Sequence, residues 1–528
     1  MRRRELFFAG MAAAAAGLWP RSEAKAQPQK GGRLHAIVQP EPSLLVLGLN
    51  LQSATQMVAG KIYQGLLTYD ARLRPQPALA TAWTISEDGL TYTFLLNRNV
   101  RWHDGQPFTA DDVVFATTKF LPSTHPVARN NFSRVTTVEA PDPHVVVFRL
   151  AEPFSPFIMA FATGSAPMLP KHIYDGTDYR TNAANATPIG TGPFKFKQWK
   201  KGQYIQLTRN EDYWKPRQPY LDDIFFHVIP DASSRALALE DKTIDLASFS
   251  DIEPADVPRL RKRPYLEVTS RGYEYFSPLS WIEINHRVAP LGDKRFRQAL
   301  MLALDRQFIA DRIFFGQAKP AVGPISSTMR FFDARLPAYP YDPTRAETLL
   351  DSMGLTRDAA GRRATIKLLA LPYGETWTRV AEYIRQALQK VGISIVLETV
   401  DAGAWAQRVA NWEFELTLDF TYQLGDPAIG VSRTYISSNI RKGVLFSNTM
   451  GYRNSKIDEL FAQAAIVSAD HERAALYSQI QNILVDEVPV AWLVELQFPT
   501  IFNIHVHDLI VSSTGVNDSF DEAYRDAI

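Results

Sequence analysis

Hydrophobic positions recur along this chain with two different periods, which predicts a mixed α/β fold. Residues 91–96 (TYTFLL) alternate apolar side chains with more polar ones, the pattern of a half-buried strand. Across 293–315, apolar residues recur at every fourth position, which indicates an amphipathic helix. A predicted helix over 375–391 ends before Gly392 and is followed by a strand-like run over 393–400. This order is typical of an α/β crossover.

The same signals place further elements along the chain. Thr109-Ala110-Asp111-Asp112 has the composition of a capping box, so we expect a helix from there to Phe120. Strand-like runs over 194–199 and 204–209 flank Lys200-Lys201-Gly202 and predict a hairpin. The remaining predicted strands are 33–38, 145–150 and 490–496, and the remaining predicted helices are 56–67, 232–240 and a long region over 455–483.

The first 26 residues have the layout of a cleavable export signal. Arg2, Arg3 and Arg4 precede an apolar run over 6–19, and Ala24-Lys25-Ala26 forms a small-x-small cleavage site. The apolar run is shorter than the roughly 20 residues that span a bilayer. Arg3-Arg4-Glu5-Leu6-Phe7 resembles a twin-arginine signal, and a Sec signal or a retained membrane anchor are the alternatives. We therefore expect an exported protein, resident in the periplasm.

Composition and charge narrow the classes of function. The 528 residues contain no cysteine, which excludes disulfides, thiol catalysis, thiolate metal sites and lipid attachment through an N-terminal cysteine. The formal charge is +1, and it falls to −2 without the predicted signal, because that segment carries five basic and two acidic residues. With no basic block, a nucleic-acid partner is not expected. The length predicts two or three domains.

Several segments, in their order along the chain, resemble a known family. The most specific are YQGLL at 63–67, VRWHDG at 100–105, TADDV at 109–113, PIGTGPF at 188–194 and RNEDYW at 209–214. Together with FRQAL at 296–300 and the region 455–494, they are similar to solute-binding protein family 5 of ABC transporters. This family comprises dipeptide-, oligopeptide- and nickel-binding periplasmic proteins. The resemblance extends over essentially the whole chain after the predicted signal.

The resemblance implies a bilobal α/β periplasmic binding protein of the large, type II-like class, with an extra subdomain in the first lobe. By this analogy, lobe I comprises 31–62, 187–280 and 495–528, the additional subdomain 63–186 and lobe II 281–494. A monomer of this kind captures a small organic solute by hinge closure and delivers it to an ABC permease. The implied solute is peptide-like, and no cofactor is implied.

Asp426 is the leading predicted ligand anchor. In peptide-binding members of the family, an aspartate in a loop after a strand binds the amino terminus of the peptide, and the matching segment here is DFTYQLGDP at 419–427. A turn aspartate before Pro427 is the alternative. The following Ala428-Ile429-Gly430 departs from the more polar stretch of the family, so the resemblance leaves peptide specificity open.

The other predicted ligand-binding residues come from loops and aromatic clusters. Glu41 follows the first strand, and Tyr275 and Phe276 lie close to the expected crossover between lobes. Aromatic side chains can stack on a ligand, and arginines can bind a ligand carboxylate, although core packing and solvation are the alternatives. The remaining candidates are Trp405, Tyr422, Arg330 and Arg433.

Motifs for catalysis are missing from the sequence. There is no His-Glu-x-x-His, Gly-x-Ser-x-Gly or Gly-x-Gly-x-x-Gly motif, and the ten histidines have no recognised metal spacing. His505-Val506-His507 is at most a weak metal signal. The sequence therefore predicts a binding protein rather than an enzyme. A periplasmic hydrolase and a sensory binding protein remain as alternatives.

Overall fold

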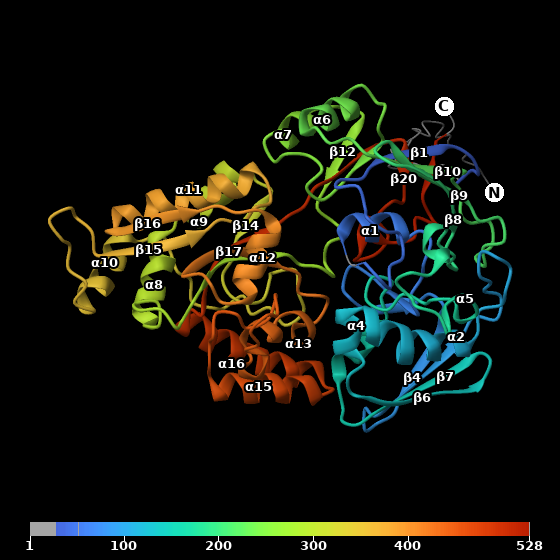
Figure 1. The fold of residues 1–528 in the computed structure, drawn as a ribbon, viewed down its shortest axis with the longest axis horizontal. Helices are drawn as coiled ribbons and strands as arrows, with labels where there is room; N and C mark the ends of the chain where they lie inside the picture. Colours follow the sequence, from blue (N-terminus) through green and yellow to red (C-terminus); the bar gives the residue numbers. More distant parts are fainter. Residues whose placement is uncertain (1–27, 51, 527–528) are drawn as a thin grey trace, which may run out of the picture.

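The computed structural model describes residues 28–50 and 52–526. The predicted export signal lies outside these residues. The described chain forms two halves, one built by residues around 279–496 and the other by the segments before and after them (Figure 1). None of the helices in the described ranges has the length and apolar character needed to cross a membrane.

Lobe I is built on a seven-stranded sheet with the order β12-β19-β11-β1-β10-β9-β8. The central β1 (Arg33–Ile37) runs parallel to β10 (Asp223–His227) and β11 (Leu246–Ala247). The predicted hairpin is formed by β8 (Phe194–Lys200) and β9 (Tyr204–Arg209). The other edge consists of β12 (Leu266–Thr269) and β19 (Thr500–Asn503), which are antiparallel.

Helices cover part of one face of this sheet. Ile37 and Ile501 pack there against α6 (Ala232–Glu240) and α7 (Val257–Leu260) in a small separate core. Leu34 and Ala36 point to the opposite face and join the main core, because successive side chains of a strand alternate between faces.

The additional subdomain contains a four-stranded antiparallel sheet. Its strands are β4 (Ala80–Ile85), β5 (Thr91–Leu96), β7 (Val145–Leu150) and β6 (Val135–Asp142), in that order. The predicted capping box is present at the start of α2 (Ala110–Phe115). Asp112 Oδ2 accepts a hydrogen bond from Thr109 N at 3.0 Å. The helix continues as a π-turn over Ala116–Phe120 and is followed by α3 (Leu121–Thr124) and α4 (Pro126–Asn131).

Lobe II is built on a six-stranded mixed sheet with the order β14-β18-β13-β17-β15-β16. Every residue of β13 (Leu279–Ile284) and β18 (Val490–Leu496) is buried, which agrees with central strands covered on both faces. The other strands are β14 (Ala318–Pro320), β15 (Ala364–Leu369), β16 (Ile393–Glu398) and β17 (Leu416–Thr421). β15 and β16 are parallel and joined through α11 (Glu375–Lys390), so the predicted crossover is confirmed.

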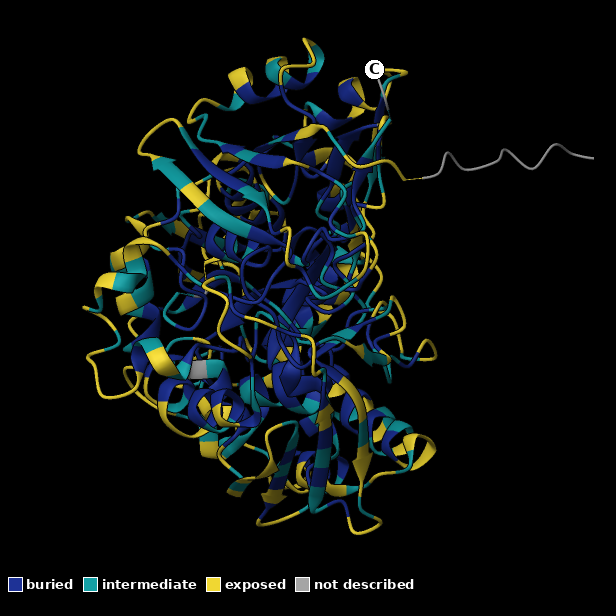
Figure 2. Cartoon of the chain, turned by 90° about the vertical axis from the view of Figure 1, so that its right-hand side faces the viewer, coloured by how far each residue is buried: buried dark blue, intermediate teal, exposed yellow. Residues whose placement is uncertain are grey.

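Further helices surround this sheet, and short elements complete the fold. Figure 2 shows that exposed residues lie mainly in loops and on outer helix faces, whereas the interior is buried. The helices of lobe II are α8 (Lys294–Ala303), α9 (Arg306–Phe308), α10 (Pro343–Ser352), α12 (Ala402–Ala410), α13 (Pro427–Gly430), α14 (Ser432–Tyr435), α15 (Ser455–Ile466) and α16 (Asp470–Glu487). The remaining elements are α1 (Ser53–Ala59), α5 (Lys171–Tyr174), β2 (Leu67–Tyr69), β3 (Pro75–Pro77), β20 (Val506–His507) and β21 (Tyr524–Arg525).

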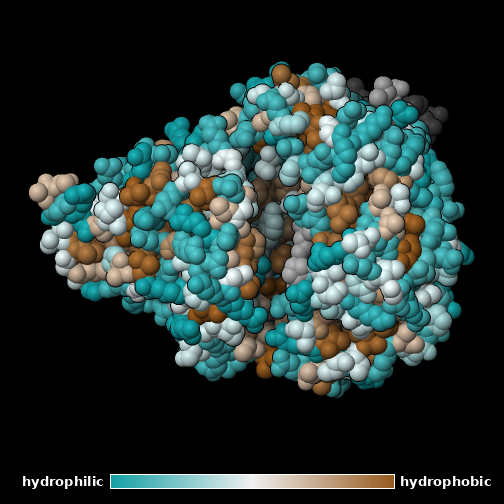
Figure 3. Space-filling view, viewed as in Figure 1, coloured by the Kyte–Doolittle hydropathy of each residue, from teal (hydrophilic) through white to brown (hydrophobic). Residues whose placement is uncertain are grey.

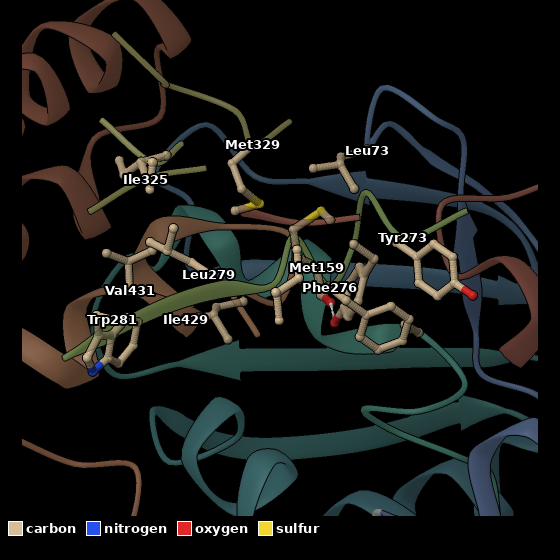
Figure 4. Packing of buried hydrophobic residues seen from close by; sticks show 14 of the residues in the cluster. Leu73, Met159, Tyr273, Phe276, Leu279, Trp281, Ile325, Met329, Ile429 and Val431 are labelled. Atoms are coloured by element: carbon tan, nitrogen blue, oxygen red, sulfur yellow. Dashed lines mark hydrogen bonds between the residues drawn. The ribbon is translucent and has the colours of Figure 1, made fainter. Parts of the chain in front are cut away.

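The chain crosses between the lobes at two places. Residues 270–278 connect β12 of lobe I with β13 of lobe II, and residues 497–499 connect β18 with β19. We refer to these two connecting segments as the hinge. Phe276 and Leu279 lie in the buried hydrophobic packing at this junction, together with Met159 of the subdomain (Figure 4).

Two predicted helices differ from the structure. The predicted helix 56–67 is α1 over Ser53–Ala59, and the following residues are buried without helical structure. A Cβ at Gly60 would lie 2.1 Å from the carbonyl oxygen of Asn517, so tight backbone packing directs the chain here. The predicted helix 293–315 is interrupted at Leu304, which adopts an extended conformation between α8 and α9.

Candidate functional site

A cavity of about 840 Å³ lies between the lobes. Figure 3 shows the furrow that separates the two halves of the molecule. One wall belongs to lobe I: residues 38–40 after β1, α1, and the loop 248–254 after β11. The facing wall belongs to lobe II and comprises residues 373–377, 419–422 and Arg433. The hinge contributes Tyr275, Phe276 and residues 497–499, so both halves and their connections enclose one space.

Aromatic rings form much of the cavity surface. Trp377, at the start of α11, stacks on Phe420 of β17 with ring centres 5.6 Å apart and planes 6° apart. Tyr422 meets Phe276 of the hinge edge-on, with ring centres 5.3 Å apart. Phe249 of lobe I contacts Phe498 of the hinge with ring centres 5.7 Å apart. Such surfaces bind apolar and aromatic groups and also attract cations to the ring faces.

Asp419 is the most buried acid of the lobe II wall. Its side chain lies on β17 and is 4% exposed. Oδ1 accepts a hydrogen bond from Phe420 N at 2.7 Å. Burial raises the pKa of this carboxyl to about 7, although the Phe420 N–H and the charge of Arg433 act in the opposite direction. Asp419 is therefore a carboxyl that titrates near neutral pH inside the cavity.

Lobe I contributes two further acids to the cavity. Asp251 is buried, and its Oδ2 accepts a hydrogen bond from Ser248 N at 2.9 Å. Burial raises its pKa to about 7, against the hydrogen bond from Ser248 and the charge of Arg235. Glu253 lies across the cleft at the N-terminus of α11, where its Oε2 is 3.4 Å from Thr376 Oγ1. This contact joins lobe I to lobe II, and the helix N-terminus favours the negative charge.

Arg433 is the basic residue of the cavity wall, and it is largely engaged with its own lobe. Its Nε donates to the carbonyl oxygen of Gly430 at 3.2 Å, and its Nη2 donates to Thr421 Oγ1 and to the carbonyl oxygen of Tyr422. Burial lowers the pKa of Arg433 to about 10, so the guanidinium stays charged at neutral pH. These bonds fix the loop after β17.

Comparison with known proteins identifies the family. The family described as "Bacterial extracellular solute-binding proteins, family 5 Middle" matches this chain over residues 74–446. The chain belongs to this family. The predicted family, the bilobal α/β fold and the role in solute binding are thereby confirmed. Members of the family are extracytoplasmic solute-binding transport proteins rather than enzymes.

Family 5 relatives of this solute-binding protein have several named ligands. The oligopeptide-binding protein AppA of Bacillus subtilis is 28% identical over 484 residues, covering 88% of this chain and 87% of the relative. The heme-binding protein A of Haemophilus influenzae is 28% identical over 473 residues, covering 85% and 83%. The structure of the periplasmic binding protein DppA from Helicobacter pylori with the peptide STSA has 25% identity and a TM-score of 0.80, covering 94% of this chain and 99% of that chain.

Half of the sequence-predicted ligand residues of this family 5 protein meet at the cavity. Tyr275 and Phe276 come from the hinge, Tyr422 from the end of β17 and Arg433 from α14. The Tyr275 hydroxyl is 2.7 Å from Ser165 Oγ and also donates to the carbonyl oxygen of Met159 at 3.2 Å. Tyr275 therefore joins the hinge to the subdomain.

The other predicted residues lie outside the cavity lining. Asp426 is fully buried within lobe II and caps α13. Trp405 is buried on α12 and donates from Nε1 to Thr417 Oγ1 at 3.0 Å. Glu41 accepts hydrogen bonds from Trp199 Nε1 at 2.7 Å and from Gly202 N, and Arg330 pairs with Asp470 at 2.6 Å.

Sequence reasoning missed the acids of the cavity. Asp419 has a recognisable signal, because it is the one charged residue of the strand LTLDFT, and buried charges require a partner. Asp251 and Glu253 lie in a polar loop whose composition does not distinguish them from solvated acids. Trp377 lies at the start of a helix, where nothing in the sequence connects it with Phe420.

Proposed function

We propose that this protein captures a small organic solute, peptide-like or of another class, in the cavity between its lobes and delivers it to an ABC import permease. It works as a monomer in the periplasm, after export by the Sec or twin-arginine route, and needs no cofactor. The observation that carries the proposal is the cavity itself, which is walled by both lobes and by both hinge segments.

The size and lining of the cavity support a small solute. A volume of about 840 Å³ is within the range of pockets that enclose small organic molecules. Aromatic walls with a few charged groups provide apolar contact and orientation. Peptide-binding relatives favour a peptide-like solute, whereas the heme-binding relative favours a broader range. We assign ligand contacts to Asp419, Trp377, Tyr422, Tyr275 and Phe276.

Closure of the lobes around the solute converts the protein from an open to a closed state. A solute that touches both walls gains contacts only when the lobes are together, so it shifts the population toward the closed state. Glu253 and Thr376 already meet across the cleft, and the loop after β17 binds the hinge through Gln423 N and the carbonyl oxygen of Phe276 at 2.7 Å. The partner permease then receives the solute from the closed form.

Transport separates this proposal from its alternatives. Membrane vesicles that contain the partner permease should take up solute only when the purified protein is added, and the solute should be recovered unchanged. A sensory binding protein would bind the solute without supporting uptake. A hydrolase would convert it to a product, which mass spectrometry detects.

A further inference from the structure

Acidic side chains outnumber basic ones in the lining of the cavity. Asp251, Glu253 and Asp419 are acids of the lining, and Arg433 is its basic residue. A fourth lining acid, Glu375, is exposed and pairs with Arg379 at 2.6 Å. Within the described ranges, the carboxyl groups of Asp419, Asp251 and Glu253 form no ion pair with a basic side chain, although Arg235 Nε donates to the main-chain carbonyl oxygen of Asp251. A solute that entered would bury these acids further and remove the water that solvates them.

Asp419 also offers the cavity a hydrogen-bond acceptor. Asp419 is 4% exposed, and its Oδ2 has no hydrogen-bond donor among the residues that the structure describes. A carboxylate oxygen without a protein donor can accept a hydrogen bond from an N–H group of a ligand.

We infer that the solute is an organic cation, in which a protonated amine or a guanidinium is attached to an apolar or aromatic body. The inference rests on the proposed function and names the solute class of that site. The cationic group binds Asp419 by a charge-assisted hydrogen bond, with Asp251 and Glu253 adding attraction from lobe I. The body lies against Trp377, Phe420 and the hinge rings, which also stabilise a cation near their faces.

Other charges fit the cavity less well. A solute with a net negative charge would meet three acids, while Arg433 already donates from Nε and Nη2 to oxygen atoms of lobe II. A bare metal ion lacks a binding group, because no three acidic or histidine side chains in the described residues come together in a way that could hold one. The acids are distributed over both walls, which suits an extended organic molecule.

Matched probes test the charge assignment by calorimetry at pH 7.5. Tryptamine and indole-3-propionate share one ring and one linker and differ in the charged group. Phe-Leu amide and N-acetyl-Phe-Leu differ in the same way on a peptide. We expect each cationic member to bind at least tenfold more tightly than its anionic counterpart. Equal or tighter binding of the anionic members overturns the inference.

Variants locate the cation. Asp419→Asn keeps the shape of the side chain and the acceptor for Phe420 N. The probe for this test is the cationic compound that the wild-type protein binds most tightly, and we expect the variant to bind it at least tenfold more weakly. Glu382→Gln is the matched control, because it removes one acid of lobe II on α11 outside the cavity, and it should leave affinity unchanged. Unchanged affinity of folded Asp419→Asn, checked by its melting temperature, also overturns the inference.

A separate measurement distinguishes failure of this inference from failure of the proposed function. The protein isolated from the periplasm is denatured mildly, and the released solute is identified by mass spectrometry and its charge by electrophoresis. A released cation supports the inference, and a released anion or neutral solute overturns it while the proposed function stands. A protein that releases no solute and binds none of the probes contradicts the proposed function, and the inference with it.

Discussion

Asp426 and Arg473 form a bidentate ion pair inside lobe II. Arg473 Nη1 donates to Asp426 Oδ2 and Arg473 Nη2 donates to Asp426 Oδ1, both at 2.8 Å. Neither side chain is appreciably exposed, and Arg473 Nε also donates to the carbonyl oxygen of Ala464 at 2.9 Å. The pair fixes α13 to α16. Asp426 is therefore positioned to stabilise lobe II, in contrast to the sequence-based expectation that it binds the solute.

Asp426→Ala should destabilise the protein rather than act on the ligand. The variant leaves the Arg473 guanidinium buried without its partner, which costs about 3–5 kcal/mol. Urea unfolding measures this loss. Asp401→Ala is a matched control, because Asp401 is an exposed helix cap in the same lobe, and it should cost only about 1 kcal/mol. A tenfold weaker affinity for an amine with unchanged stability would instead support the sequence-based expectation.

Asp419→Asn should stabilise the empty protein at high pH. Burial raises the pKa of Asp419 from its ordinary value near 4 to about 7. Because the pKa of Asp419 is higher in the folded than in the unfolded protein, protonation of this carboxyl stabilises the folded state. The stabilisation is complete below the pKa of the unfolded protein, near 4, and is lost as the pH rises through 7. Removing the charge should therefore add about 1–3 kcal/mol to the free energy of unfolding at pH 8 and almost nothing at pH 4. Equal effects at both pH values would contradict the burial of a charged Asp419.

Binding of a cation should tighten as pH rises. A cation binds the ionised form of Asp419, so binding lowers its pKa and releases protons. Arg433, Glu283 and Tyr373 also face this carboxyl. Arg433 stays charged because its pKa is about 10, and burial raises the pKa of both Glu283 and Tyr373.

With a pKa of about 7, the ionised fraction of Asp419 rises roughly tenfold between pH 6 and pH 8. The affinity for tryptamine should rise by about the same factor, and Asp251 adds to the change in the same direction. Calorimetry in two buffers of different ionisation enthalpy measures the proton release. A pH-independent affinity in wild type would show that no neutral-range carboxyl takes part.

Gly425→Ala should perturb the hinge through Tyr275. Gly425 has a φ of 75°, and its N–H donates to the carbonyl oxygen of Tyr275 at 2.8 Å. A Cβ there would lie 2.8 Å from Met159 Cε and 3.0 Å from the Tyr275 ring. We expect a loss of about 2–3 kcal/mol from strain and overpacking, measured by thermal unfolding.

Gly443→Ala provides the matched control for that variant. Gly443 has a similar φ of 83°, but a Cβ would meet nothing within 4 Å. It should lose about 1 kcal/mol from backbone strain alone. If both variants lose the same stability, the crowding at Tyr275 contributes nothing.

Local patterns predicted the elements whose structure depends on nearby residues. The hairpin at 194–209 and the crossover through α11 follow from short-range periodicity and from glycine or lysine-rich breaks. The predicted 56–67 helix is confirmed only as far as Ala59, because distant backbone, from Asn517 among others, packs against Gly60. Resemblance identified the family, since several modest motifs occur in the right order.

The site was predictable only in part, because its residues come from distant segments. Tyr275 and Phe276 were predicted from their proximity to the expected crossover, Tyr422 as a further aromatic residue and Arg433 as a partner for a ligand carboxylate, and all four line the cavity. The partner of Asp426 lies 47 residues further along the chain, and no local pattern connects the two. Asp251 shares the cavity with Asp419 although the two lie on different lobes, so only the three-dimensional structure brings these acids together.

Small-angle X-ray scattering, combined with mass spectrometry, tests the central claim most directly. The purified protein is compared without solute and with the solute that it releases after isolation from the periplasm. Enclosure between the lobes predicts a smaller radius of gyration with solute and recovery of that solute at unchanged mass. Identical scattering with saturating solute bound, or recovery of a product of different mass, would contradict the account.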